Sequence, residues 1–378
     1  MTTEPPTSAV LVSPVVGMPE VRAGDDLAAL VAEHATDLRD GDIVVVSSKV
    51  VSKAEGRVVT GDRAAAVEAE TVRVVAERGT TRIVQTRHGF VMAAAGVDTS
   101  NVATGSVVLL PVDPDASARA LRRGLARRRG VTVGVIVTDT FGRPWRLGQT
   151  DLAVGAAGVR VLDDYRGRRD VHGNELVVTA PALADELASA ADLVKGKLGQ
   201  VPVAVVRGLA ALVTSDDGPG VQALVRSAED DLFRLGSREA ARQALRPAPR
   251  ELVDGTVDPV ALQRAFEAVA ETETPWWGLV RVHDVPARKP LLDALSLPAS
   301  LPALVVPYLR PNAPTPAALL DLGGVRERLV LACAVEGLAT RWFPAERLDV
   351  AALMTLLPSR DVEPVGLLAI GAAAETRA

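Results

Sequence analysis

Apolar residues are grouped in short runs along the first two thirds of the chain. β-Branched runs at 9–16 and 42–46 are separated by a helical stretch near 26–39, and further apolar runs lie at 81–86, 106–112, 131–138, 151–162, 174–179 and 201–208. Runs of this length and composition predict β-strands.

Helix-forming stretches separate several of these runs. Good helix formers with helical apolar spacing predict helices over 62–78 and 181–196. Another helix is predicted over 113–130, because Asp and Pro stand at its start and Gly at its end. Strands and helices alternate without a regular strand–helix–strand repeat, which predicts a mixed α/β (α+β) fold.

A Pro- and Arg-rich stretch divides the chain. A helical pattern over 237–253 breaks into "RPAPREL", and we place a domain boundary near 245–250, giving domains 1–245 and 250–378. The second domain has a predicted helix near 258–271, strands near 279–283 and 303–308, a helix near 325–338 and a strand near 365–370. This pattern predicts a second, small α/β unit.

The composition is that of an ordinary globular protein, with 48% hydrophobic and 24% charged residues among 378. A net charge of −5 gives no reason to expect binding to nucleic acid or acidic membranes. We expect no transmembrane helix, since no uninterrupted apolar run approaches about 18 residues. The N-terminal residues lack the pattern of a signal peptide, so we expect a cytoplasmic protein.

Cysteine and histidine contribute little to the candidate chemistry. The single cysteine, Cys333, excludes an intramolecular disulfide and a cysteine-cluster metal site. Its apolar surroundings, "LVLACAVEGL", favour a buried core thiol over a nucleophile. The histidines are scattered and do not indicate a zinc site; they are His34, His88, His172 and His283.

Two polar clusters follow apolar runs. The stretch "VVVSSKVVSKAEGR" brings Ser48, Lys49 and Lys53 to the end of a predicted strand, where hydroxyls and ammonium groups suit phosphate oxygens. The stretch "AAAGVDTSNV" places Asp98 and Asn101 in a Gly-containing loop. Taken alone, each cluster is also consistent with an ordinary polar turn.

A third cluster, "VGVIVTDTFGRPWRLGQTD", places Asp139 and Thr140 directly after an apolar strand. A carboxylate and a hydroxyl are ligands that Mg²⁺ or Mn²⁺ prefers. If Asp98 and Asp139 approached to about 4 Å without a cation, their repulsion would be roughly 4 kcal/mol at an effective dielectric constant near 20. A divalent cation would reverse that sign, and the three clusters together therefore indicate a metal–phosphate site.

Eight stretches, in order, resemble the coenzyme F420-0:L-glutamate ligase family, in particular its actinobacterial two-domain members. They are "LVSPVVGMPEVRAGDDLA", "DGDIVVVSSKVVSKAEGR", "AAAGVDTSNV", "LLPVDPDASA", "VGVIVTDTFGRPWRLGQTD", "GNELVVT", "ADLVKGKLGQVPVAVVRG" and "DDLFRLG". They cover about residues 8–236.

The resemblance implies a GTP-dependent enzyme that adds L-glutamate to coenzyme F420-0, and γ-linked glutamates to F420-1, through an acyl phosphate. It also implies a homodimer, an unusual α/β fold without a P-loop, and dependence on Mn²⁺ or Mg²⁺, with K⁺ as a further candidate ion. A different class of function, a non-catalytic binder of GTP or F420, stays open as an alternative.

The site residues that the resemblance implies fall into three groups. The metal positions are Asp98, Asp139 and Thr140, and the catalytic positions are Asp98, Asp139 and Lys53. The GTP-contacting positions are Met18, Pro19, Glu20, Val21, Ser48, Lys53 and Asn101. Because the cofactor substrate is itself anionic, we add Lys49, Arg143 and Arg146 as candidate substrate contacts.

The second domain faintly resembles an FMN-binding nitroreductase. It is short, and "RELVDGTVDP" stands where an Arg-rich entry would hold the FMN phosphate. We therefore expect a truncated nitroreductase-like remnant that does not bind FMN. The alternative is a bifunctional protein that also reduces a dehydro precursor of F420 with FMN.

Overall fold

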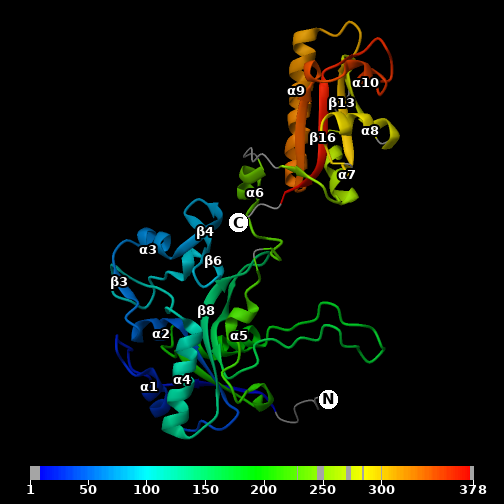
Figure 1. Cartoon of the computed structure of the whole chain (residues 1–378). Coiled ribbons are helices and arrows are strands. Elements are labelled where there is room, and N and C mark those ends of the chain that lie inside the picture. Colours follow the sequence, from blue (N-terminus) through cyan, green and yellow to red (C-terminus); the bar gives the residue numbers. More distant parts are fainter. Residues whose placement is uncertain are drawn as a thin grey trace. The chain divides into compact units, whose positions relative to one another are not determined.

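The computed structural model divides the chain into two compact units, Met1–Ser237 and Arg238–Ala378 (Figure 1). It describes residues 9–227, 229–244, 251–269, 274–282, 285–298 and 300–374. The predicted boundary near 245–250 lies outside these described residues, so the proposed extents of the two domains stay predictions.

The first unit is built on a five-stranded sheet with the order β1-β10-β2-β8-β9. Its strands are β1 (Leu11–Val15), β10 (Val203–Arg207), β2 (Ile43–Ser47), β8 (Gly134–Gly142) and β9 (Gln149–Ala157). Only the pair β2–β8 is parallel among these neighbours. Val135, Ile136 and Val137 of β8 are all fully buried, which requires cover on both faces of the sheet.

Helices supply that cover. Helix α4 (Pro114–Arg129) packs against β8 and β9 and contacts α1 (Leu27–His34), and α5 (Leu183–Lys195) packs against β9, β1 and β10. Figure 1 shows α4 and α5 on either side of β8. The predicted ends of α4 are confirmed, because the Asp113 side chain accepts from Ala116 N and Gly130 ends the helix with φ 66°.

Smaller elements complete the first unit. A three-stranded antiparallel sheet contains β4 (Thr71–Arg78), β5 (Thr81–Thr86) and β6 (Val91–Ala93). Strands β3 (Val58–Thr60) and β7 (Ser106–Val108) form a pair. The remaining elements are α2 (Ser48–Ala54), α3 (Arg63–Glu70) and the 3₁₀ turns η1 (Ala94–Gly96), η2 (Ala210–Leu212) and η3 (Val221–Leu224).

The prediction of one helix over 62–78 is wrong in its second half. Helix α3 ends at Glu70 and the chain continues as β4, whose residues pair with β5. Val72, Val74 and Val75 are β-branched, and the β5 strand offers them a ladder that an isolated helix end cannot match.

The predicted strand at 174–179 is also wrong. The segment from Asp163 to Pro181 forms an irregular arm whose backbone bonds join Tyr165 to Thr179 and Gly167 to Leu176, visible as a long projecting loop in Figure 1. Val177 and Val178 are 70% and 85% exposed, so this apolar run gains no sheet neighbour in the described chain.

The second unit has a sheet with the order β11-β16-β13-β12, extended by β14 next to β16 and β15 next to β13. The strands are β11 (Leu252–Val253), β12 (Trp277–Val282), β13 (Ala303–Leu309), β14 (Leu338–Pro344), β15 (Glu363–Pro364) and β16 (Gly366–Ala373). The helical elements are α6 (Ser237–Ala244), α7 (Pro259–Glu267), α8 (Val285–Ala294), α9 (Thr315–Val335), η4 (Ala345–Arg347) and α10 (Val350–Met354).

Side-chain alternation along β13 divides the core of this unit into two layers. Val305 packs with α7 and α9, whereas Leu304 and Val306 pack with α8 and α10. Cys333 of α9 is fully buried in the first layer, as the sequence predicted, and burial raises the pKa of its thiol to about 12.

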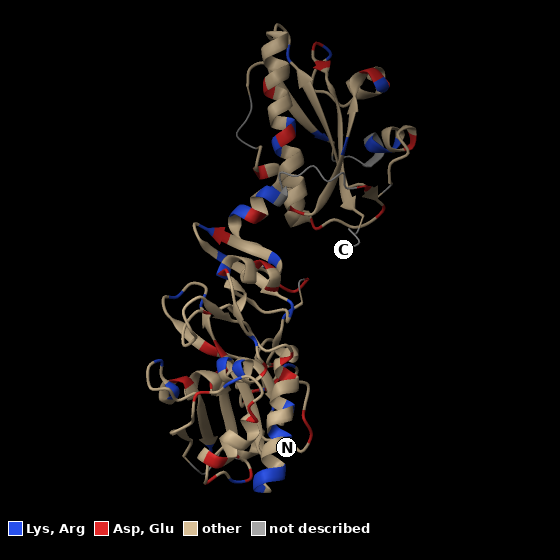
Figure 2. Ribbon diagram, turned by 90° about the vertical axis from the view of Figure 1, so that its left-hand side faces the viewer, with Lys and Arg blue, Asp and Glu red and all other residues tan. Residues whose placement is uncertain are grey.

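Charged side chains of both signs are interspersed along each unit (Figure 2). This distribution agrees with the small net charge of −5. Among the described residues, no helix is long and apolar enough to cross a membrane.

Candidate active site

The candidate site lies where the parallel pairing of β2 and β8 ends. The last pair in register is Ser47 with Thr138. Beyond it, β2 turns directly into α2, while β8 continues to Gly142 alongside β9. Asp139 therefore lies within a strand, not after one as the sequence predicted. At this position β8 no longer pairs with β2, so Asp139 has a strand neighbour only on the β9 side.

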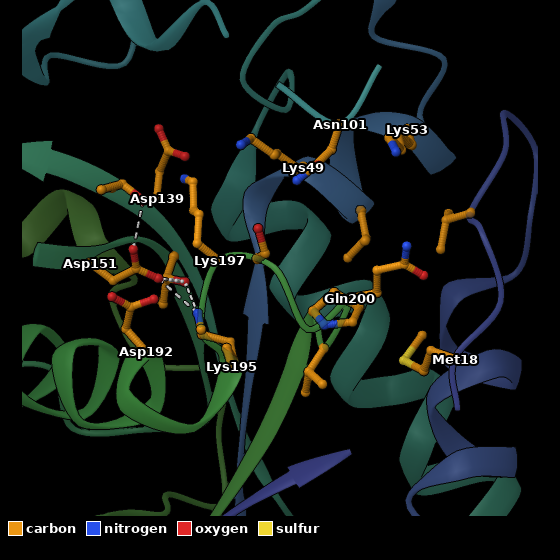
Figure 3. Close-up of a pocket in the computed structure, with 18 of the residues that line it drawn as sticks. Met18, Lys49, Lys53, Asn101, Asp139, Asp151, Asp192, Lys195, Lys197 and Gln200 are labelled. Atoms are coloured by element: carbon orange, nitrogen blue, oxygen red, sulfur yellow. Dashed lines mark hydrogen bonds and ion pairs between the residues drawn. The ribbon is translucent and has the colours of Figure 1, made fainter. Parts of the chain in front are cut away.

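A cavity of about 790 Å³ opens at this point. Its walls come from the Met18–Val21 segment, α2, the loop 101–103, the adjoining parts of β8 and β9, and the end of α5 with the loop that follows (Figure 3). Ligand sites in α/β proteins commonly lie at the carboxyl ends of strands where neighbouring connections diverge.

Asp98 and Asp139 both line one narrow hollow beside this cavity, together with Ser48, Lys49 and Ser52. Ser48 Oγ donates to Asp139 Oδ1 at 2.9 Å, and Lys49 Nζ lies 2.5 Å from Asp98 Oδ2. The buried Ser52 Oγ has no hydrogen-bond partner among the residues that the structure describes. The hollow is thus bordered by hard oxygen atoms, one of them unsatisfied.

The two carboxyl groups differ in their pKa values. Burial raises the pKa of Asp139 to about 6 despite its hydrogen bond from Ser48. Burial also acts to raise the pKa of Asp98, but the Lys49 ammonium and two hydrogen bonds from Ser100 outweigh it and bring the value to about 2. At pH 7 both carboxyl groups are mainly ionised.

These oxygens fit a Mg²⁺ or Mn²⁺ ion. Within the described part of the chain, no three His, Cys, Asp or Glu side chains form a group that could hold a metal by themselves. An ion at Asp98 and Asp139 would therefore need hydroxyl, water or substrate oxygens as its further ligands.

Thr140 faces the other side of β8. Side chains alternate along a strand, and Thr138 and Thr140 both donate to Asp151, from Oγ1 to Oδ2 and from Oγ1 to Oδ1, at 2.9 Å each. Asp151 is the direct neighbour of Thr140 across the β8–β9 pair. The structure thus brings Asp139 and Thr140 to the same cavity, with their side chains on opposite faces of the strand.

A buried ion pair anchors this second face. Lys195 Nζ donates to Asp151 Oδ2 and to Thr138 Oγ1, at 2.8 Å each, as drawn in Figure 3. Asp151 and Lys195 are each 5% exposed. Burial acts to raise the pKa of Asp151, but Lys195 and the two threonine hydroxyls outweigh it, so that the pKa is lowered.

The sequence analysis assigned no role to Asp151 or Lys195. Both stand within quoted motifs, "GRPWRLGQTD" and "VKGKLGQ". The signal that could have found them is a charged residue within otherwise apolar helix and strand patterns, since charged residues are rarely buried unless paired.

The residues predicted to contact GTP line the cavity, except Ser48. The segment Met18–Val21 lines one wall, and Lys53 Nζ lies 2.5 Å from Glu20 Oε1. Asn101 lines the cavity with a left-handed backbone, φ 57°. Ser48 lies in the narrow hollow beside Asp139.

Among the three predicted substrate contacts, only Lys49 lines the cavity. Arg143 donates to Leu147 O in the exposed turn between β8 and β9, and Arg146 is exposed in the same turn. His88 does not line the cavity. Its ring hydrogen-bonds with the carbonyl oxygen of Pro111, and burial lowers the pKa of its imidazole.

Comparisons with known proteins identify a family for the first unit. The model of the F420-0:Gamma-glutamyl ligase family matches residues 16–208. The coenzyme F420:L-glutamate ligase of Methanopyrus kandleri is 44% identical over 245 residues, covering 59% of this chain and 97% of that protein. The protein of the same name from Methanothermobacter thermautotrophicus is 41% identical over 245 residues, covering 58% and 97%.

Solved structures that resemble part of the chain include nitroreductases. Nitroreductase A of Vibrio parahaemolyticus is 16% identical with a TM-score of 0.31, covering 36% of this chain and 69% of that one. An FMN-dependent nitroreductase of Clostridium difficile is 16% identical with a TM-score of 0.30, covering 35% and 87%. Likeness at this level assigns neither a cofactor nor a reaction to the second unit.

The family match covers every segment that forms the cavity, so the protein is an enzyme of the ligase class. The chain belongs to the F420-0:gamma-glutamyl ligase family.

The buried pair generates a stability prediction. Replacing Lys195 with Met leaves the buried Asp151 carboxylate without its counter-charge, which we expect to lower the free energy of unfolding by about 3–5 kcal/mol. The measurement is urea unfolding of the full chain followed by hydrogen exchange in peptides from β8 and β9.

The matched control lies two residues along the chain. Lys197 is exposed and has no ion pair within the described residues, so Lys197→Met should change the same free energy by no more than about 0.5 kcal/mol. Equal effects of the two substitutions would contradict a stabilising role for the Asp151–Lys195 pair.

Proposed function

We propose that the protein catalyses the GTP- and metal-dependent addition of L-glutamate to coenzyme F420-0, and of γ-linked glutamates to F420-1. One observation carries the proposal: Asp98 and Asp139 line the same hollow beside a cavity whose walls hold Lys49 and Lys53. Family membership supports the choice of substrates, since both archaeal relatives are named coenzyme F420:L-glutamate ligase.

The chemistry explains why such a site is needed. A carboxylate does not react with an amine at neutral pH, so the F420-0 carboxylate must first be activated. Transfer of the γ-phosphoryl group of GTP to that carboxylate gives an acyl phosphate and GDP. The glutamate amine then attacks the acyl carbon, the amide bond forms, and phosphate leaves with the electron pair of the broken C–O bond.

The residues that line the cavity would have different roles in this reaction. Lys53 and the Met18–Val21 segment would bind GTP, Asn101 would contact it from the opposite loop, and Ser48 would orient Asp139 through its hydrogen bond. Asp98 and Asp139 would hold Mg²⁺ or Mn²⁺, with water or substrate oxygens as further ligands, because the predicted metal residue Thr140 faces the other side of β8 and donates its hydroxyl to Asp151. A bound divalent ion would neutralise charge between these carboxylates and the triphosphate.

The test is a reconstituted reaction with purified full-length protein, GTP, Mn²⁺, L-glutamate and F420-0, with products sized by mass spectrometry. We expect F420 carrying added glutamate, together with GDP and phosphate. Chelation with EDTA should abolish turnover, because two carboxylates and a triphosphate repel one another without a cation. GTP binding without any ligated product would favour a non-catalytic binder, and retained turnover in EDTA would contradict metal dependence.

Asp139→Asn should lower kcat by more than about 100-fold, because it removes a metal-binding charge rather than a residue that merely supports a ligand. The measurement is steady-state turnover at saturating GTP over a range of Mn²⁺ concentrations. Asp361→Asn, at an exposed position in the second unit, provides an isosteric control that should keep wild-type turnover. Near-normal kcat in Asp139→Asn would remove this residue from the reaction centre.

We further propose that the protein is a homodimer. The arm from Asp163 to Pro181 supports this, because it projects from the first unit with Val171, Val177 and Val178 between 70% and 96% exposed. Light scattering should give twice the mass of the chain, and Val177→Asp with Val178→Asp should shift it towards the monomer. A monomeric wild-type protein at micromolar concentration would contradict the proposal.

A further inference from the structure

The cavity holds four lysines, and three of them are engaged. Lys49 pairs with Asp98, Lys53 with Glu20 and Lys195 with Asp151. Lys197 has neither an ion pair nor a hydrogen bond within the described residues. Its ammonium group is therefore the cation of the cavity wall that is available to a ligand without breaking an existing pair.

The backbone around Lys197 fixes its direction. Gly196, which ends α5, has φ 60° and ψ −178°, a conformation that is accessible essentially only to glycine. This turn separates two lysines that are close in sequence. Lys195 points into the buried face of the sheet, whereas Lys197 lines the cavity. Gln200, in the same loop, also lines the cavity with a left-handed φ of 54°.

Lys49 and Lys53 of the cavity lining come from α2, whereas Lys197 comes from the loop after α5. Figure 3 shows its side chain directed towards the end of the cavity that contains Asp139, whereas Met18 lies at the other end. Asp192, one turn earlier, is close enough to interact with the Lys197 charge but forms no ion pair with it. An anion arriving at this end would meet Lys197 across from the carboxylates.

We propose that Lys197 binds a carboxylate of one of the two acidic substrates, either L-glutamate or F420-0, beside the reacting groups. This inference rests on the proposed function. Both substrates bring negative charge to the end of the cavity that already holds Asp139 and, in the proposed reaction, the GTP phosphates, so a free ammonium group there offsets the repulsion. In the proposed function Lys53 binds the nucleotide phosphates, so Lys197 binds the acidic substrates and not GTP.

The experiment compares wild-type protein with Lys197→Met and Lys197→Arg in the full-length chain. KM is measured separately for L-glutamate, F420-0 and GTP, with the other two substrates saturating. Loss of a charge-assisted hydrogen bond should raise KM for one acidic substrate by about 10- to 100-fold. KM for GTP should stay within about twofold, and Lys197→Arg should recover most of the loss, because it restores the charge.

Each pattern of results has a defined meaning. A selective rise for L-glutamate assigns the carboxylate to the amino acid, and a selective rise for F420-0 assigns it to the cofactor precursor; both support the inference. Equal rises for all three substrates, a rise for GTP alone, or unchanged KM values would overturn it.

Two controls separate this inference from the proposed function. Lys289→Met removes an exposed lysine from the second unit and should leave all three KM values unchanged. If the wild-type protein forms no product, the proposed function fails. If it forms product and Lys197→Met behaves like wild type, only the role of Lys197 fails.

Discussion

The candidate active site depends on a single topological constraint, the end of the parallel pairing between β2 and β8. Up to Ser47 and Thr138 the two strands satisfy each other's backbone groups and bury apolar side chains on both faces. One residue later the first strand becomes a helix and the second continues as a hairpin. The polar side chains that follow lose their sheet neighbour at the same level, and the cavity opens there.

The same constraint places the charged side chains of the site on two different faces of β8. On one face of β8, Asp139 meets Ser48 from the departing helix, next to Asp98 and its partner Lys49. On the other face, Thr138 and Thr140 close on Asp151, which Lys195 neutralises. On this face of β8 the negative charge of Asp151 is therefore balanced by Lys195 within the protein. The face that carries Asp139 has two carboxylates, Asp98 and Asp139, and one nearby lysine, Lys49. Its net charge is therefore balanced only by what binds there.

Much of the site was predictable from the sequence because its residues follow apolar runs. Asp139 after "VGVIV", and Ser48 after "DIVVV", are polar at points where the strand pattern stops, and the motif resemblance supplied their roles. Asp151 and Lys195 could not be found this way. Their pairing joins positions 44 residues apart, and it depends on strand register and helix packing that local pattern does not encode. The fold was predicted with similar limits. Helix α4 has explicit start and stop residues, whereas the change from α3 to β4 at Thr71 lacks a breaker and depends on pairing with β5.

The burial of Cys333 has a practical consequence for the study of the two units. It is the chain's sole cysteine, and it lies wholly within the core beneath α9. In alkylation the thiolate attacks the electrophilic reagent, so a buried thiol whose pKa is raised to about 12 can be modified only when that core opens. Its alkylation rate therefore reports opening of the second unit alone, and it is blind to fluctuations of the ligase unit. The alkylation rate of this native cysteine thus measures how often the core of the second unit opens, without any introduced label.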